Sequence, residues 1–397
     1  MEYKFSEKIA NMKPSAIREI FKSLADPEII AFAAGNPAPE SFPVEAFERL
    51  SADILRETPV TALQYGITEG HTPLREAVAA RIHDKFGVGR DFDTTIITTG
   101  GQQGIDLCCK VMCDPGDVVI CEKPTFIGAL NAFRANGAIP VGVDLGPDGM
   151  DPNRLEAALN ANPRAKLIYT IPTFHNPMGV CTSFKRRIDM YAIAKRHGVL
   201  ILEDNPYGEL RFRGEDIAAI KSFDDDGVVM YCSSFSKILS AGMRVGFLCG
   251  PAPVIQKIVV AKQVNDVHTN MFFQMLCERY IKNYNLDAHI EGIRALYRRR
   301  AGVMAAAYDA CVPDWAPRTD PEGGLFLWSA LPEGTDIQAL VAALLERKVA
   351  VVTGAAFMPD ENEPSWGIRL NYSTPTDEQI GRGIEILGEE IKKAAKG

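Results

Sequence analysis

The sequence lacks the features of three broad classes of protein. None of its apolar runs approaches the roughly 20 residues of a membrane-spanning helix, and residues 1–4 lack the charged and apolar regions of a signal peptide. A basic excess is also missing, because 43 Lys and Arg residues stand against 51 Asp and Glu residues, a formal net charge of −8 at pH 7. Nucleic-acid binding needs clustered basic residues. We therefore expect a cytoplasmic protein with no membrane or nucleic-acid partner.

The nine cysteines have no spacing that would staple a small disulfide-bonded domain. Cys108, Cys109 and Cys113 lie close together, but they fall within an apolar helical pattern and no histidine accompanies them. A zinc site needs four converging ligands. We therefore expect no metal, and we expect most cysteines to be small buried apolar residues.

The middle of the chain alternates between strand and helix patterns, which predicts an α/β fold. The predicted strands are nearly continuous in apolar residues, as strands buried on both faces are. They cover residues 95–99, 118–121, 139–143, 167–171, 199–202, 228–232 and 245–249. The pattern predicts a mostly parallel sheet of seven strands. The connection at 233–244 contains no helix pattern and is too short for a comfortable parallel crossover, so the last strand should return antiparallel.

Helix patterns fill most of the gaps, at 102–112, 127–135, 152–159 and 183–197. The last of these has Thr182 as its predicted N-cap and Gly198 as its stop. Beyond Pro251 the chain is helical and then ends in a second α/β section, with predicted strands at 323–328, 349–352 and 367–372. We predict a large domain of residues 44–285. The smaller domain would combine residues 286–397 with the N-terminal segment 1–43, which contains a predicted short helix at 15–21.

The stretch from Ser233 to Gly246 concentrates the chemistry. It follows a predicted buried strand, so Lys237 should lie beyond the carboxyl end of that strand, where open α/β sheets bind ligands. Ser234, Ser236 and Arg244 place hydroxyl and guanidinium donors around this amine. The combination suits a phosphorylated aldehyde, because the amine can form a Schiff base while the donors hold the phosphate.

Two other predicted strands end in polar residues. The strand at 95–99 runs into Gly100, Gly101 and Gln102 and then a helix, whose free amides and dipole can bind a phosphate. Asp204 lies just beyond the predicted strand at 199–202, at the buried end of that strand, where an ionised carboxylate needs a cationic partner. A pyridinium ring would serve, and so would a structural ion pair or a helix N-cap.

The motif Ser234-x-Ser236-Lys237, followed by Gly242-x-Arg244-x-Gly246, closely resembles the lysine motif of class I/II pyridoxal-phosphate aminotransferases of fold-type I. The resemblance extends from Gly35 to Arg369. It is strongest to the branch that contains 2-aminoadipate, kynurenine and aromatic aminotransferases. The segments that carry this likeness are residues 34–43, 63–66 and 99–104.

The resemblance implies an enzyme with pyridoxal 5′-phosphate as its cofactor. Such an enzyme moves an amino group from an amino acid to 2-oxoglutarate by a ping-pong Schiff-base mechanism. Lys237 would hold the cofactor and shuttle the substrate proton, and Asp204 would pair with the ring nitrogen. Asn176, in an Asn-Pro-x-Gly segment, and Tyr207 would hydrogen-bond the 3′ oxygen of the ring. Phe126 would stack on the ring, in a position that is more often Tyr in the family.

The remaining implied roles concern the phosphate, the substrate and the partner subunit. Gly101 and Gln102 would bind the phosphate together with Ser234, Ser236 and Arg244, although Gly101 replaces a serine that is a frequent phosphate ligand. Arg369 would bind the substrate α-carboxylate, with Gly35 and Asn176 beside it. Asn36 departs from the small or apolar residue that is usual in the branch.

Two predictions reach beyond a single active site. Tyr65, in Leu-Gln-Tyr-Gly, would contact the cofactor phosphate of the other subunit in a homodimer with shared active sites. Arg18, in the short helix at 15–21, would read the distal carboxylate of acidic substrates. Alternatively, Arg18 is a solvent-exposed arginine on an amphipathic helix, with no role in substrate recognition.

Two alternative functions stay open at this point. A β-lyase or a decarboxylase could use the same fold and cofactor, because neither fixes which bond is broken. A ligand-sensing transcription regulator could carry an aminotransferase-like domain fused to a DNA-binding module. The predicted catalytic domain begins within about 30 residues, which is too short for such a module, so we expect the enzyme.

Overall fold

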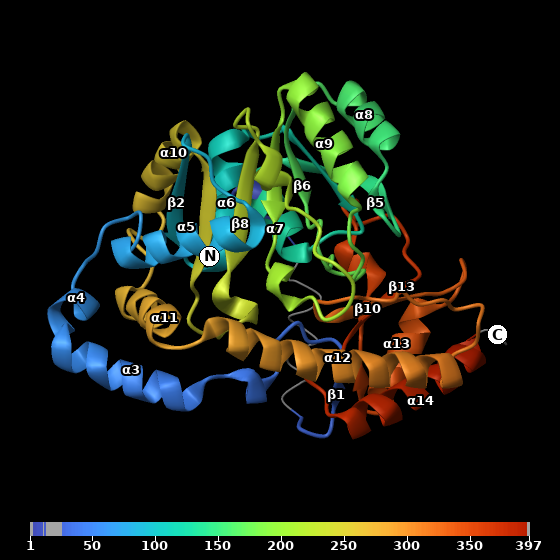
Figure 1. The fold of residues 1–397 in the computed structure, drawn as a ribbon. Helices are drawn as coiled ribbons and strands as arrows, with labels where there is room; N and C mark the ends of the chain where they lie inside the picture. Colours follow the sequence, from blue (N-terminus) through green and yellow to red (C-terminus); the bar gives the residue numbers. More distant parts are fainter. Residues whose placement is uncertain (1–2, 11, 13–25, 395–397) are drawn as a thin grey trace.

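The structure is a computed structural model, and it describes residues 3–10, 12 and 26–394 (Figure 1). The predicted helix at 15–21 and Arg18 lie outside these residues. The strands are β1 (Ile30–Ala31), β2 (Asp93–Thr98), β3 (Val118–Lys123), β4 (Ile139–Gly146), β5 (Gly149–Met150), β6 (Ala165–Thr170), β7 (Leu200–Asp204), β8 (Val229–Ser234), β9 (Gly246–Pro251), β10 (Phe326–Ala330), β11 (Val349–Ala350), β12 (Val352–Thr353) and β13 (Gly367–Asn371).

The α-helices are α1 (Glu7–Ala10), α3 (Val44–Glu57), α4 (Pro59–Leu63), α5 (Thr72–Phe86), α6 (Gly100–Met112), α7 (Ile127–Ala135), α8 (Pro152–Ala161), α9 (Phe184–His197), α10 (Ala252–Gln263), α11 (Met271–Asn283), α12 (Leu286–Cys311), α13 (Ile337–Glu346) and α14 (Asp377–Ala394). Short 3₁₀ helices lie between some of them, and one of these, η4 (Phe235–Lys237), carries Lys237.

The large sheet contains all seven predicted strands, in the order β2-β9-β8-β7-β6-β3-β4-β5. Strands β4, β3, β6, β7 and β8 pair in parallel, whereas β9 returns antiparallel beside β8, which confirms the predicted topology. The two-residue strand β5 adds an eighth strand by antiparallel pairing with β4. The carboxyl ends of the five parallel strands therefore lie at one edge of the sheet, where ligands of such folds bind.

Both faces of the large sheet are covered by helices, which explains its apolar strands (Figure 1). Side chains alternate between the faces along each strand. Ile168 and Ile201 pack in one core with residues of α8 and α9. Leu167, Tyr169 and Leu202 point to the opposite face and pack in a second core with residues of α6 and α7. The side chain of a residue such as Tyr169 is therefore placed by the register of its strand.

The C-terminal part of the chain forms two smaller sheets. Strands β10, β13 and β12 make an antiparallel sheet, and β1 pairs in parallel with β11. The predicted strand at 349–352 is therefore two short strands that belong to different sheets. Figure 1 shows α12 running along one side of the molecule toward α13 and α14. The domain boundaries at residues 43/44 and 285/286 stay a prediction.

The N-cap of α9 differs from the sequence prediction by one residue. Ser183, not Thr182, is the cap, and its Oγ accepts a hydrogen bond from the backbone N–H of Arg186. Thr182 is buried and its carbonyl accepts from Nε of Arg187, so it belongs to the preceding turn. The stop at Gly198 is confirmed, because this residue adopts the left-handed conformation at φ 64°.

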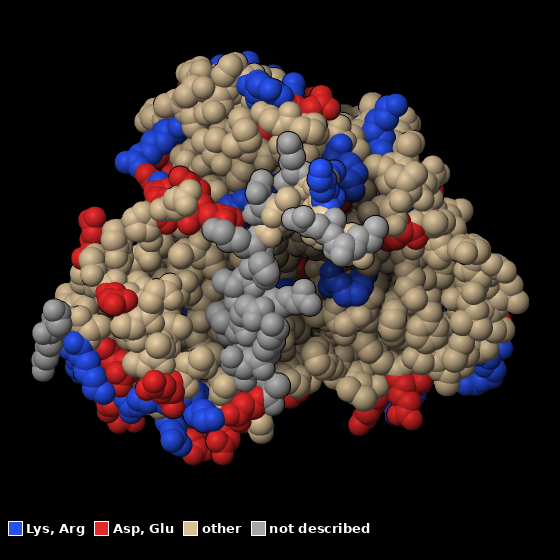
Figure 2. All heavy atoms as spheres, turned by 180° about the vertical axis from the view of Figure 1, so that it is seen from behind, with Lys and Arg blue, Asp and Glu red and all other residues tan. Residues whose placement is uncertain are grey.

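The described helices include none that is long and apolar enough to cross a bilayer. Figure 2 shows the face of the molecule opposite to the view in Figure 1. Lys and Arg side chains are interspersed there with Asp and Glu side chains.

Candidate active site

A cavity of about 330 Å³ lies at the carboxyl ends of β7 and β8, beside the N-terminus of α6. Twelve of the fourteen predicted site residues line it. They are Gly35, Gly101, Gln102, Phe126, Asn176, Asp204, Tyr207, Ser234, Ser236, Lys237, Arg244 and Arg369. These residues come from segments that are far apart in the sequence. The fold therefore brings the predicted amine, the predicted phosphate ligands and the predicted carboxylate ligand around one space.

Lys237 ends η4, directly after β8. Its Nζ donates a hydrogen bond to the backbone carbonyl of Gly35 (2.6 Å), and it has no carboxylate partner among the described residues. The pKa of Lys237 is lowered to about 8, mainly by burial and in addition by the nearby guanidinium groups of Arg369 and Arg244. A larger fraction of this amine is therefore neutral near pH 7 than of an ordinary lysine, as a nucleophile requires.

Asp204 ends β7 and is only 5% exposed. Burial raises the pKa of Asp204 to about 7, although a hydrogen bond from the hydroxyl of Tyr169 to Oδ2 (2.8 Å) works against this rise. Asp204 forms no ion pair with any described residue. A buried carboxylate without a cation is costly. The site therefore suits a ligand that brings a positive charge or a proton to Asp204.

Arg369, in β13, presents the opposite charge and is only 3% exposed. Its Nη1 donates to Oδ1 of Asn176 (2.9 Å) and its Nη2 to the carbonyl of Ala33 (2.8 Å). The guanidinium lies over the rings of Phe326 and Phe357, with Cζ 4.4 and 5.0 Å from their centroids. Burial lowers the pKa of Arg369 to about 10, so it stays protonated at neutral pH. A buried guanidinium held only by neutral groups suits a carboxylate ligand.

The other end of the cavity is an anion cradle at the start of α6. Gly100 and Gly101 open this helix, so their backbone N–H groups have no partner within it. A Cβ at Gly246 would lie 2.5 Å from the carbonyl carbon of Gly100, and a Cβ at Gly100 would lie 2.1 Å from Nη2 of Arg244. The close approach of the two backbones therefore requires glycine at position 246, and the φ of 73° favours glycine at position 100. Arg244 adopts a left-handed φ of 54°, and its guanidinium donates to the carbonyls of Thr99 and Ala241.

The aromatic side chains at the cavity are held by packing. Tyr207 is buried, lies edge-on to Phe326 with ring centroids 5.9 Å apart, and has a pKa that burial raises above its ordinary value. Phe126 is the N-cap residue of α7 and packs against the core that contains Leu167, Tyr169 and Leu202. The side-chain amide of Gln102 donates to the carbonyl of Gly128 (2.7 Å), which ties α6 to α7.

Two predicted site residues do not line the cavity. Tyr65 is 81% exposed, and among the described residues its ring lies edge-on to that of His268, with ring centroids 5.8 Å apart. Its hydroxyl therefore has no role in the cavity of its own chain, which is compatible with a role in a partner. Arg18 lies outside the described residues.

The sequence reasoning missed two buried groups beneath the cavity. One is Tyr169, the hydrogen-bond donor to Asp204. The other is Glu122, in β3, which accepts from Oγ1 of Thr170 (2.5 Å) and from the backbone N–H of Ile171 (2.9 Å). Nε2 of His175 lies 3.2 Å from Oε2 of Glu122, but it is poorly aligned for a hydrogen bond. The signal for Glu122 was available, because it is an acidic residue at the end of a buried strand, as Asp204 is.

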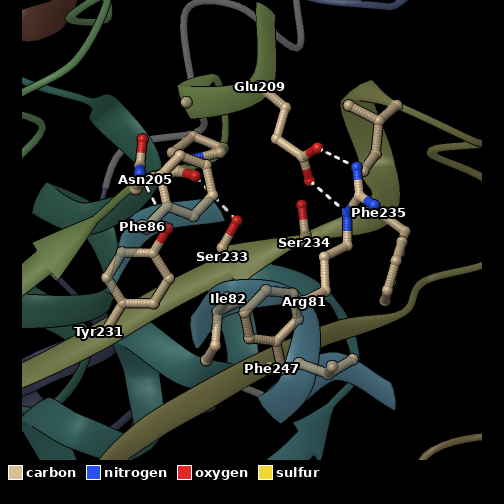
Figure 3. Close-up of a pocket in the computed structure, with 14 residues that line it drawn as sticks. Arg81, Ile82, Phe86, Asn205, Glu209, Tyr231, Ser233, Ser234, Phe235 and Phe247 are labelled. Atoms are coloured by element: carbon tan, nitrogen blue, oxygen red, sulfur yellow. Dashed lines mark hydrogen bonds and ion pairs between the residues drawn. The ribbon is translucent and has the colours of Figure 1, made fainter. Parts of the chain in front are cut away.

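A second, much smaller hollow lies on the other side of Ser234 and Pro206, which line both spaces (Figure 3). Its volume of about 20 Å³ is enough for about one water molecule. An ion pair between Arg81 and Glu209 closes one side, and Nδ2 of Asn205 donates to the hydroxyl of Tyr231 (2.9 Å) (Figure 3). The two charged residues that line this hollow, Arg81 and Glu209, are paired with each other, so the hollow is less suited to a ligand than the larger cavity.

Comparisons with known proteins agree with this geometry. The model of the family "Aminotransferase class I and II" matches residues 27–387. The aromatic-amino-acid aminotransferase 1 of Thermococcus litoralis is 39% identical over 396 residues, which is 99% of this chain and 95% of that protein. The 2-aminoadipate transaminase of Thermus thermophilus is 37% identical over 98% of this chain and 96% of its own length.

A solved structure shows the same similarity in three dimensions. The crystal structure of Pyrococcus horikoshii kynurenine aminotransferase, in complex with PMP and with KYN and KYA as substrate and product, has a TM-score of 0.95 to this chain. The two chains are 36% identical, and the match covers 99% of this chain and 98% of the other. The similarity in sequence and in backbone structure therefore extends over nearly the full length of both chains.

Proposed function

The chain belongs to the class I and II aminotransferases, and from this premise we propose that it uses a broad range of amino donors, including 2-aminoadipate and aromatic amino acids, with 2-oxoglutarate as the acceptor. It is a fold-type I enzyme that transfers amino groups with pyridoxal 5′-phosphate as its cofactor. The two relatives described above are an aromatic-amino-acid aminotransferase and a 2-aminoadipate transaminase, so they do not favour the β-lyase, decarboxylase or regulator alternatives. One observation carries the proposal: the amine of Lys237, which has no carboxylate partner within the part of the chain that the structure describes, shares a cavity with Asp204 and Arg369.

The residues of the cavity fit the cofactor at three points. The glycine cradle of Gly100 and Gly246, with the hydroxyls of Ser234 and Ser236 nearby, suits a phosphate. Asp204 is a buried carboxylate that pairs with no cationic side chain of residues 3–10, 12 and 26–394, which suits a protonated ring nitrogen. The amine of Lys237 suits the aldehyde. We propose that these groups bind the cofactor, with Asn176, Tyr207 and Phe126 contacting its ring.

Bound pyridoxal 5′-phosphate supplies an aldehyde that condenses with amines and a ring that delocalises the electron pair left at the substrate Cα. The side chains of the cavity supply proton transfer, substrate binding and charge pairing. Lys237, with a pKa lowered to about 8, accepts a proton from the substrate Cα at Nζ and releases it again. Arg369 binds and orients the α-carboxylate by a bidentate contact. Asp204 holds the positive charge at the ring nitrogen.

The lining of the cavity supports a broad donor range. Ile105, Ile171 and Phe326 provide apolar surface, whereas Asn36 adds an amide beside Gly35. Apolar contacts discriminate weakly between side chains of similar size. An enzyme with this lining can accept aromatic and aliphatic side chains in one half-reaction and a dicarboxylate in the other.

A panel of amino donors tests this function most directly. Steady-state transamination with 2-oxoglutarate should convert 2-aminoadipate, kynurenine, phenylalanine or tyrosine to its 2-oxo acid and form glutamate in equal amount. Release of ammonia and pyruvate would instead identify a lyase, and release of carbon dioxide would identify a decarboxylase. Either result without glutamate formation would contradict the proposal.

We propose that Arg18 reads the distal carboxylate of acidic substrates. The support is its sequence position alone. Arg18→Ala should raise KM for glutamate, 2-aminoadipate and 2-oxoglutarate, and it should largely spare leucine and phenylalanine. An equal rise for acidic and apolar donors would leave Arg18 without a role in recognition.

We also propose a homodimer in which Tyr65 of each chain completes the phosphate site of its partner. The surface around Tyr65 supports this, because Leu63, Ile67 and Val264 are large apolar side chains that are exposed in the single chain. Exposed apolar surface of this kind is typical of subunit interfaces. Sedimentation should give a dimer, and a fully active monomer would contradict the proposal. Tyr65→Phe should weaken cofactor binding only in the dimer.

The domain division is a further proposal. The large sheet lies entirely within residues 44–285 and the three-stranded sheet within residues 286–397, and β1 from the N-terminal segment pairs with β11. Fragments expressed separately test it. The 44–285 fragment should keep its helical circular dichroism and unfold cooperatively, and an unfolded fragment would count against these boundaries.

We propose that the enzyme works in the cytoplasm, as its sequence predicts. Cell fractionation tests this, because the activity should stay in the supernatant after the membranes have been pelleted. Recovery of the activity in the membrane or extracellular fraction would contradict it.

A further inference from the structure

Tyr169 and Asp204 lie on adjacent strands and on the same face of the large sheet. Strands β6 and β7 pair in parallel, with Tyr169 opposite Leu202. Asp204 follows Leu202 by two residues, so its side chain points to the face of Tyr169. The hydroxyl of Tyr169 donates to Oδ2 of Asp204 at 2.8 Å. The contact is therefore a diagonal one between neighbouring strands, fixed by their register.

Tyr169 does not line the cavity. It is fully buried, and Phe133 of α7 packs edge-on against its ring with centroids 5.5 Å apart. Asp204 does line the cavity, so it lies between Tyr169 and the cofactor space. Among the described residues, Tyr169 is the only hydrogen-bond partner of the Asp204 carboxylate. Any effect of Tyr169 on the reaction therefore acts through Asp204.

We propose that Tyr169 is a positioning residue that binds Oδ2 of Asp204 and thereby keeps the carboxylate ionised and Oδ1 available for the ring nitrogen of the cofactor. This inference rests on the proposed role of Asp204. A hydrogen bond to the ionised form of a carboxylate favours that form. Without Tyr169, the buried carboxylate would take up a proton of its own and hold the ring nitrogen less well.

The electrostatics around the pair agree with this role. Burial raises the pKa of Asp204, and the charge of Glu122 raises it further. The hydrogen bond from Tyr169 is the interaction that opposes both. Burial and the nearby Asp204 carboxylate raise the pKa of Tyr169 well above its ordinary value, so its hydroxyl stays a donor over the working pH range.

Cofactor affinity provides a test that does not depend on turnover. The apoenzyme of Tyr169→Phe is titrated with pyridoxal 5′-phosphate and with its 1-deaza analogue, which has C–H in place of the ring nitrogen. We expect the variant to bind the cofactor about fivefold more weakly, because only part of the stabilisation from this one hydrogen bond reaches the ring nitrogen through Asp204. We expect no weakening for the analogue, because it has no ring nitrogen to hold. Equal weakening for both ligands would overturn the inference.

Tyr231→Phe is the matched control. Tyr231 is a buried tyrosine on β8 whose hydroxyl accepts a hydrogen bond from Nδ2 of Asn205 (Figure 3). Among the described residues it forms no hydrogen bond with Asp204, so the variant loses a buried hydroxyl contact without changing the partner of Asp204. The apoenzyme of Tyr231→Phe should bind the cofactor and its 1-deaza analogue as tightly as the unaltered enzyme does. Thermal unfolding of all apoenzymes identifies a folding defect, and the comparison of the two ligands within one protein is independent of such a defect.

A double-mutant cycle tests whether Tyr169 acts through Asp204. Tyr169→Phe should lower kcat about tenfold with little change in KM for the amino donor, and it should change kcat less than twofold in an Asp204→Asn background. Losses that multiply would overturn the inference. If Asp204→Asn itself left both cofactor affinity and kcat unchanged, the proposed role of Asp204 would fail and this inference with it. If Tyr169→Phe left cofactor affinity and kcat unchanged while Asp204→Asn lowered them, the inference about Tyr169 would be wrong and the proposed role of Asp204 would remain.

Discussion

The two ends of the cavity handle charge in different ways. At one end, Asp204 and Arg369 are single buried charges, 5% and 3% exposed, and neither has an ion-pair partner among the described residues. At the other end, the exposed Arg244, the buried hydroxyls of Ser234 and Ser236 and the backbone amides of Gly100 and Gly101 surround the predicted phosphate position. The first end thus depends on single charged side chains, whereas the phosphate end spreads its binding over several donors, most of them neutral.

The difference has a direct energetic consequence. A buried charge has little water to replace a lost partner, so the ligand that neutralises it gains much from that one contact. A neutral donor that shares its anion with several other donors contributes less, and its loss costs about 0.5–1.5 kcal/mol for a typical hydrogen bond. Substitutions of Asp204 and Arg369 should therefore have much larger effects than substitutions of the phosphate donors.

The largest effect is expected for Asp204→Ala. Turnover should fall by several orders of magnitude, because the ring nitrogen loses its partner while the phosphate contacts remain. Steady-state kinetics at saturating cofactor measure the loss, and circular dichroism checks the fold. A fall of less than about tenfold, or ~1.4 kcal/mol of barrier, would make Asp204 a structural residue.

Arg369→Lys should have the next largest effect. Lysine keeps the charge but loses the planar fork, so kcat/KM for amino acids should fall about 100-fold, or ~2.7 kcal/mol. Cofactor affinity should hardly change. Amines without a carboxylate are the control substrates, and a similar loss for them would show that Arg369 does not recognise the α-carboxylate.

The pH dependence of reconstitution tests the lowered pKa of Lys237, which is about 8 in the absence of cofactor. Only the neutral amine attacks an aldehyde, so the association rate of apoenzyme and cofactor should rise with pH. The rise should be about 50-fold between pH 6 and 8 and should level off above pH 8, as the fraction of neutral amine does. A rate that still rises steeply above pH 9 would place the amine in an ordinary, solvated environment.

Ser236→Ala should have the smallest effect. The other phosphate donors remain, so cofactor affinity should fall less than about tenfold and kcat at saturating cofactor should be unchanged. Equilibrium titration of the apoenzyme measures the first quantity. If Ser236→Ala cost as much as Asp204→Ala, the contrast between the two ends would be wrong.

Local patterns predicted much of the fold and the site. Lys237, Asp204 and Gly101 each follow an apolar strand, and the carboxyl ends of parallel strands must meet at one edge. The antiparallel return of β9 followed from a connection too short for a crossover. These features depend on a few neighbouring residues, so one sequence reveals them.

The missed features depend on contacts between distant residues. Tyr169 lies in an apolar strand, and only the register of β6 and β7 brings its hydroxyl to Asp204. The cap of α9 shifted from Thr182 to Ser183 because two adjacent hydroxyl residues offer the same local signal. The split of the predicted strand at 349–352 depends on β1, which is more than 300 residues away.

The site of cofactor attachment shows whether Lys237 is the amine that holds the cofactor. Borohydride reduction of the loaded enzyme converts a lysine-bound cofactor to a stable secondary amine, and peptide mass spectrometry then locates the label. We expect a pyridoxyl-phosphate label on Lys237, and we expect Lys237→Ala to lose both the label and transamination. A label on another lysine in the unaltered enzyme, or transamination that survives in Lys237→Ala, would contradict this expectation.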